Sequence, residues 1–119
     1  MKLKNNPLQN KSYELALSIV KLCKKIMIEH KEYVLSKQLL KSGTSVGANI
    51  IEANGAISKA DFSSKISISY KESLETKYWL YLLKDSGFIF EKDFQQLIEE
   101  ADEISKILFS ILKTTRIKN

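Results

Sequence analysis

Three glutamates have the spacing that most invites a catalytic interpretation. Glu72 and Glu75 lie one helical turn apart, and Glu52 lies in an earlier helical segment. Neighbouring carboxylates can act as an acid and base pair, or hold metal ions inside a helical bundle. Di-metal bundles also use Glu-x-x-His motifs, but His30 is the only histidine and has no glutamate three residues before it. We therefore expect no metal site, no cofactor and no enzymatic activity.

A structural use of these glutamates is the stronger alternative. Glu72 and Glu75 are expected to form charge pairs with Lys71 or Lys77, or hydrogen bonds with Asn49 and Ser45 across a helix interface. Such contacts would fix the register of the helices. An acid and base pair made by the two carboxylates remains the enzymatic alternative.

The only cysteine, Cys23, does not support nucleophilic catalysis. It lies among apolar residues, and His30, the one available imidazole, follows two turns later on the same segment. We expect Cys23 to be a small apolar residue buried in the core. A single cysteine also excludes a disulfide within this sequence and fits a reducing cytoplasm. We expect no signal peptide and no membrane span, because every apolar run is short.

The glycine-rich stretch SGTSVGANIIEANGA, residues 42–56, could be mistaken for a phosphate-binding loop. A P-loop requires Lys followed by Ser or Thr after its last glycine, whereas Gly47 is followed by Ala-Asn-Ile. A helix in which Gly43 and Gly47 let a neighbouring backbone come close explains the composition better. Asn49 and Glu52 would then face the interior. The residues predicted to set helix packing or subunit register are Ser45, Gly47, Asn49, Glu52, Glu72 and Glu75.

Helical periodicity extends over almost the whole chain of 119 residues, which has one proline, Pro7. Helices are predicted at about residues 11–30, 34–55, 58–86 and 91–115, with Asn10 or Ser12 capping the first, Ser58 capping the third and Gly87 ending it. Four helices with short connections predict a single all-α domain, residues 1–119, folded as an antiparallel up-and-down four-helix bundle.

Two of these helices are apolar over more of their surface than a single core requires. The first leaves only a narrow polar strip, so we expect a second partner for it, such as another subunit. The third is apolar almost all round and is predicted to be central and buried. Its aromatic residues Tyr78, Trp79 and Tyr81 are assigned to the core or to a subunit interface rather than to stacking on nucleic-acid bases.

The net charge of +5 is concentrated near the N-terminus, where residues 1–41 carry nine lysines and three glutamates. A clustered basic excess is typical of proteins that bind an anionic partner such as RNA or DNA. The alternatives are lysines that only solvate a helix face, and a module that binds a protein partner without nucleic acid. The predicted phosphate-binding residues are Lys21, Lys24, Lys25, Lys31, Lys37 and Lys41.

The segments QLLKSGTSVGANIIEANGA and SKADFSSKISISYKESLETKYWLYLLKDSGFI closely resemble a family of bacterial four-helix bundle proteins. These were first noticed as reading frames in intervening sequences of large-subunit ribosomal RNA genes. The positions that match the family pattern are Gln38, Leu39, Ser45, Ala48, Asn49, Ile50 and Glu52, while many members have proline in place of Gly47 and glycine in place of Ala53. The resemblance implies a homopentamer. The family likeness also extends to the accessory variability protein of diversity-generating retroelements, which resembles this chain in fold. That protein binds a reverse transcriptase and nucleic acid through a basic surface.

Overall fold

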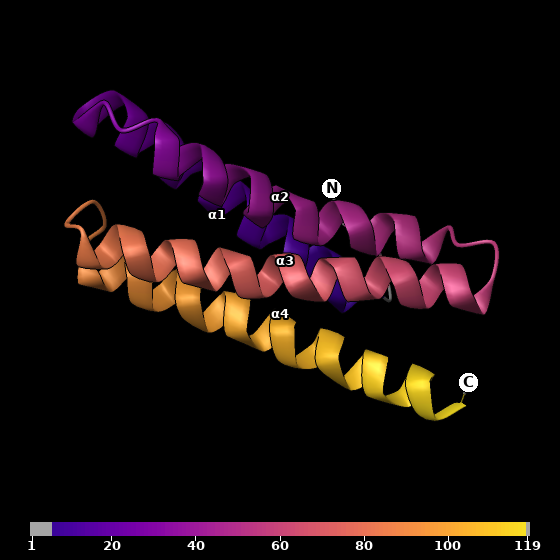
Figure 1. Cartoon of the computed structure of the whole chain (residues 1–119). Coiled ribbons are helices and arrows are strands. Elements are labelled where there is room, and N and C mark those ends of the chain that lie inside the picture. The colour runs from indigo at the N-terminus through magenta and orange to yellow at the C-terminus, as the bar shows by residue number, and fades with distance from the viewer. Residues whose placement is uncertain (1–5, 119) are drawn as a thin grey trace.

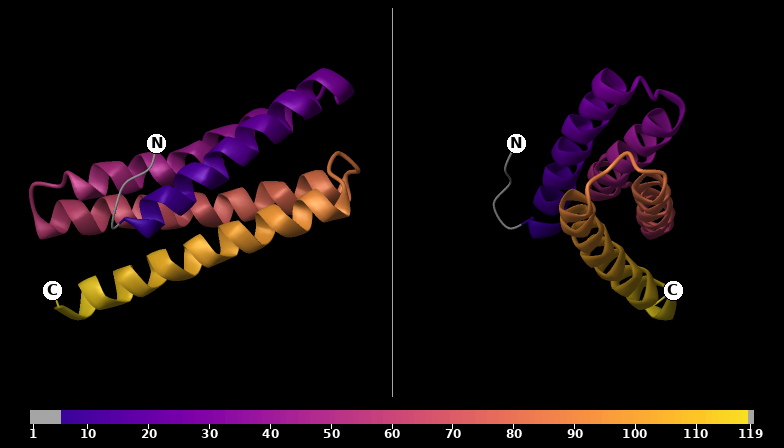
Figure 2. Two further views of the ribbon diagram at one scale, coloured as in Figure 1. Left: turned by 180° about the vertical axis from the view of Figure 1, so that it is seen from behind. Right: turned by 90° about the vertical axis from the view of Figure 1, so that its left-hand side faces the viewer.

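The structure, a computed structural model, describes residues 6–118. Its four helices are α1 (Pro7–His30), α2 (Val34–Asn54), α3 (Lys59–Asp85) and α4 (Glu91–Lys118). Each helix runs antiparallel to the next and packs on it, and α1 also contacts α4, which closes the bundle (Figures 1 and 2). The predicted all-α four-helix bundle is confirmed.

The predicted start of α1 was wrong by four residues. Asn6 caps the helix, because its side-chain oxygen accepts a hydrogen bond from the backbone N–H of Gln9 at 3.2 Å. Pro7 then occupies the first turn, where its missing N–H costs nothing. Ser12, one of the two expected caps, is instead buried and donates to the carbonyl of Gln9 at 2.9 Å.

The other helix ends follow local hydrogen-bond chemistry. Ser58 accepts from the N–H of Asp61 at 3.0 Å, and Gly87 has φ +86 after α3, so both predictions are confirmed. Gly55, at the end of α2, has φ −100, which is a backbone angle that any residue can adopt. The left-handed position after α1 is taken by Lys31, with φ 50.

Glu32 caps α2 from the short connection after α1. Its carboxylate accepts hydrogen bonds from the backbone N–H groups of Val34, Leu35 and Ser36 at 2.8–3.0 Å. Burial by itself would raise the pKa of Glu32, but these bonds to the charged form hold it below its ordinary value. The connection between α1 and α2 is therefore anchored to the start of α2 by a carboxylate that accepts from three backbone N–H groups.

The core is mainly apolar, although every helix buries at least one polar side chain and α3 buries three in its middle. Leu15 and Ile19 of α1, Leu39 and Val46 of α2, and Leu108 of α4 are fully buried. The inner face of α3 instead carries small hydroxyl residues in its middle, and these are Ser69, Ser73 and Thr76.

The prediction that α3 is buried on every side was wrong for this chain. Ile68, Leu74, Tyr78 and Tyr81 point outward and are 39–59% exposed. Small hydroxyl residues allow the middle of α3 to lie close to α2 and α4, while Ile66, Leu80 and Leu83 are buried and other large apolar side chains of α3 face outward. Among the described helices, none combines the length and hydropathy of a membrane-spanning segment.

Candidate nucleic-acid interface

The six predicted phosphate-binding lysines all lie at one end of the bundle and are all exposed. Lys21, Lys24 and Lys25 belong to the C-terminal half of α1, and Lys31 follows that helix. Lys37 and Lys41 belong to the N-terminal half of α2. Because α1 and α2 are antiparallel, the fold brings together two sets of lysines that are separated along the chain.

These lysines have no acidic partner, a property that Lys59, Lys71 and Lys113 share elsewhere in the described part of the chain. Within the described part of the chain, none of the six lies within 4.0 Å of a carboxylate oxygen. The lysines that do form ion pairs are Lys11, Lys65, Lys77, Lys84 and Lys106. Unpaired lysines are thus concentrated at the α1–α2 end, whereas elsewhere they are interspersed with lysines that form ion pairs.

Close packing along the middle of α1 and α2 holds this helix pair together. Both Gly43 and Gly47 are buried against α1. A Cβ at Gly43 would lie 2.5 Å from Cδ1 of Ile19, and a Cβ at Gly47 would lie 3.1 Å from Oγ of Ser12. The glycine-rich stretch is therefore a helix surface at which another helix approaches closely.

Cys23 contributes to the same hairpin. It is buried, as predicted, and its thiol donates to the carbonyl of Ser36 at 3.3 Å. Burial, with a smaller contribution from the charge of Glu32, raises the pKa of Cys23 to about 12. A thiol that stays protonated is a poor nucleophile, so Cys23 packs α1 on α2.

A groove between α1 and α4 borders the lysines. It encloses about 240 Å³, and Lys21 and Lys25 stand on its α1 wall with Ser18. Asp93 and Gln96 stand on the α4 wall. The groove is therefore basic on one side and carries a single carboxylate on the other.

Aromatic residues that the sequence analysis did not select lie at the same end. Lys25 Nζ lies 5.4 Å from the ring centroid of Phe90, which is 73% exposed. His30 meets Phe88 edge to face at 5.3 Å. The sequence signal was the run Phe-Ile-Phe directly after the Gly87 turn, but only the fold places it beside α1.

Of the glutamates proposed to set helix register, only Glu52 forms an ion pair with another helix in the described part of the chain. Glu52 is exposed and pairs with Lys65 at 3.2 Å, so the expected interior position was wrong. Glu75 is also exposed and accepts from the indole N–H of Trp79 at 3.1 Å. Burial and the nearby Glu75 raise the pKa of Glu72, while Lys41 acts in the opposite direction.

The partners proposed for Glu72 and Glu75 were also wrong. Asn49 is half-buried and donates to the carbonyl of Ser45 at 2.8 Å, within its own helix. The hydroxyl of Ser45 donates to the carbonyl of Lys41 at 2.7 Å. These two side chains therefore donate to backbone carbonyl groups of their own helix, because a four-residue spacing places each one over the preceding turn.

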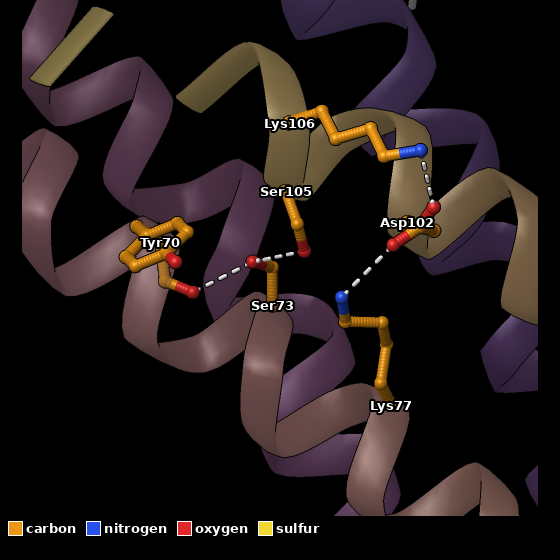
Figure 3. Close-up of polar contacts among 6 residues, drawn as sticks. All are labelled: Tyr70, Ser73, Lys77, Asp102, Ser105 and Lys106. Atoms are coloured by element: carbon orange, nitrogen blue, oxygen red, sulfur yellow. Dashed lines mark hydrogen bonds and ion pairs between the residues drawn. The ribbon is translucent and has the colours of Figure 1, made fainter. Parts of the chain in front are cut away.

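Polar side chains link several pairs of helices in the described part of the chain, and Figure 3 shows the contacts that join α3 to α4. The hydroxyl groups of Ser73 and Ser105 lie 2.7 Å apart in the core. Farther out, Asp102 lies between Lys77 at 3.1 Å and Lys106 at 3.0 Å. Hydrogen bonds from Lys106 and Lys77 hold the pKa of Asp102 below its ordinary range. Within the described residues, no three His, Cys, Asp or Glu side chains are arranged to hold a metal ion.

Comparison with known proteins identifies the family. The sequence matches the family model described as 23S rRNA-intervening sequence protein over residues 4–110. It is 47% identical to a crystal structure from Bacteroides thetaiotaomicron, described as a protein with unknown function from the S23 ribosomal protein family. The match covers 89% of this chain and 98% of that one, with a TM-score of 0.87. No curated protein matches the sequence. The chain therefore belongs to the 23S rRNA-intervening sequence protein family.

Proposed function

We propose that this protein is a non-enzymatic, homo-oligomeric helical scaffold that binds RNA or DNA through its phosphate backbone. The observation that carries the proposal is the set of six exposed lysines without acidic partners at the α1–α2 end. Mobile, unpaired ammonium groups attract phosphates without reading sequence. A cytoplasmic location is part of this proposal, because a lone buried thiol suits a reducing compartment.

Self-association is supported by apolar side chains left on the outer surface. Leu74 is 41% exposed and Phe109 is 46% exposed, and both line a groove between α3 and α4. Leu17 of α1 and Ile51 of α2 are 40% and 46% exposed on other helices. More than one apolar face per chain suits a ring of subunits, and the resemblance of the sequence implies five.

The test is binding of duplex DNA and structured RNA across a salt series, with light scattering on the same sample. Phosphate binding predicts an affinity that falls steeply with salt. Reversing Lys21, Lys24 and Lys25 to Glu should weaken binding to every sequence and reduce the salt slope by about 3.

A matched control makes the same change in charge elsewhere. Lys59, Lys71 and Lys113 are exposed, lie outside the α1–α2 end, and have no carboxylate within 4.0 Å in the described part of the chain. Their reversal to Glu should reduce affinity less than the first triple variant does. Equal losses would show that only net charge matters. Absence of binding at low salt would overturn the proposal and favour a module that binds a protein partner.

A further inference from the structure

We propose that the lysine-rich end of the bundle prefers single-stranded nucleic acid, and that unpaired bases stack on Phe90 beside Lys25. This inference rests on the proposed function, because the same lysines supply the phosphate contacts. It adds a class of ligand, namely single strands whose bases are not paired in a double helix. RNA and DNA share this chemistry.

The exposure of Phe90 is the first argument. Phe90 lies in the α3–α4 connection and is 73% exposed, whereas Phe88 and Ile89 beside it turn toward the bundle. A benzene ring left in water without a contact in the core has an energetic cost that burial against a ligand would remove. Its place in a short turn also leaves the ring face accessible.

The second argument is the charge beside that ring. Lys25 Nζ lies 5.4 Å from the ring centroid, so an ammonium group and an aromatic face are already in contact. Proteins that bind single strands combine aromatic platforms for bases with nearby cations for phosphates. Tyr33, 49% exposed in the connection that also contains Lys31, offers a second ring at the same end.

The third argument is the small pocket between α1 and the α3–α4 connection. It holds about 220 Å³ and is lined by Lys25, Glu29 and His30 of α1 with Phe88 and Phe90. This volume is below the roughly 300–1,000 Å³ of sites for drug-sized ligands, so it suits one planar group. Glu29 repels phosphate but can accept a hydrogen bond from an exocyclic amino group, which favours a base there.

The groove between α1 and α4 extends the site along the strand. Lys25 lines both this groove and the small pocket, and Lys21 lies one turn earlier on the groove wall. A strand whose base lies on Phe90 can therefore place its next phosphates near these lysines. A duplex offers the same phosphates but keeps its bases stacked and out of reach.

The experiment compares two oligonucleotides of equal length and charge with the full-length protein by fluorescence anisotropy. One is an unstructured 12-mer, prepared as RNA and as DNA, and the other has the same backbone with abasic sites in place of its bases. We expect wild type to bind the 12-mer with bases roughly tenfold more tightly. Phe90→Leu should remove this preference and leave abasic binding unchanged, while Phe90→Trp should retain it.

Phe109→Leu is the matched control, because Phe109 is also an exposed phenylalanine of the α4 region but lies far along the helix from Phe90. It should not change the preference for bases, because any effect of Phe109 on the proposed α3–α4 subunit contact applies equally to both oligonucleotides. Equal binding of both oligonucleotides by wild type, or an unchanged preference in Phe90→Leu, would overturn the stacking site and leave phosphate binding intact. If neither oligonucleotide binds at low salt, the proposed function itself fails.

Discussion

Gly43 of α2 and Ile19 of α1 occupy adjoining space so closely that no side chain fits between them. A Cβ built at Gly43 would lie 2.5 Å from Cδ1 and 3.0 Å from Cγ2 of Ile19, and Ile19 is fully buried. Real Cβ atoms essentially never approach another heavy atom at 2.5 Å. The isoleucine therefore fills the volume that any other residue at position 43 would need.

Gly43→Ala is expected to destabilise the protein despite the better helix propensity of alanine. Alanine should gain about 1 kcal/mol in propensity, whereas overpacking a full core costs about 1–3 kcal/mol. Ile19 cannot move easily, because β-branching restricts χ1 and so fixes Cγ2, and because Cδ1 could turn about χ2 only within a fully buried site. We expect a net loss of about 1 kcal/mol, measured by urea unfolding.

Two further variants test whether the contact between Gly43 and Ile19 causes the loss of stability. Gly55→Ala places a Cβ no closer than 3.7 Å to its neighbours at φ −100, so it should be neutral or slightly stabilising. Ile19→Val removes Cδ1, and it should cost less in the Gly43→Ala background than in wild type. Additive effects of the two changes would show that the contact is not the cause.

The hydroxyl pair between α3 and α4 predicts an asymmetric response to alanine. Ser73 donates its one hydroxyl proton to the carbonyl of Tyr70 at 2.6 Å, so Ser105 must be the donor in the pair. Ser73→Ala leaves the buried Ser105 without its acceptor and should cost about 1 kcal/mol. Ser105→Ala leaves Ser73 bonded to Tyr70 and should cost less. Thermal unfolding of both variants measures the difference, and equal costs would contradict this donor assignment.

Glu100 predicts a stability change that depends on pH. One carboxyl oxygen, Oε2, is buried with no hydrogen-bond partner among the described residues. Burial, and then the charges of Glu14 and Glu103, raise the pKa of Glu100. Because the folded-state pKa exceeds that of the unfolded chain, ionisation of Glu100 favours unfolding. The destabilisation is absent below both pKa values and complete above the folded one.

Glu100→Gln should therefore raise Tm at pH 7 and lose this advantage at about pH 3, below the ordinary pKa of glutamate. The gain should be a few degrees at most, because the group is only partly buried and water screens its neighbours. Glu99→Gln, an exposed neighbour on the same helix, should show no such gain. A Glu100→Gln gain that persists unchanged at about pH 3 would argue against an electrostatic cause.

The outer groove between α3 and α4 predicts the effect of a charge on assembly. Leu74 lines it with Tyr70 and Phe109, whose rings lie 5.7 Å apart. If this face joins subunits, Leu74→Glu should lower the mass measured by light scattering, because a carboxylate would be buried without a partner. Ile57→Glu, at a residue 94% exposed in the α2–α3 connection, should leave the mass unchanged. An unchanged mass in Leu74→Glu would place the subunit contact elsewhere.

The sequence by itself determined the fold class, the number of helices and several of their ends. Helical periodicity, Ser58 and Gly87 are local signals, and local hydrogen bonds and backbone angles decide helix ends. The charge count also located the basic excess near the N-terminus. It could not show which lysines have acidic partners, since most of those carboxylates come from other helices.

Only the tertiary structure decided which face of each helix is buried. The apolar residues of α3 suggested a central helix, yet Ser69, Ser73 and Thr76 are inside, because close helix approach requires small side chains. Likewise, Phe90 and Lys25 are 65 positions apart in the sequence and meet only where α1 ends beside the α3–α4 turn. Periodicity describes one helix at a time, whereas burial and contact depend on what the neighbouring helix leaves open.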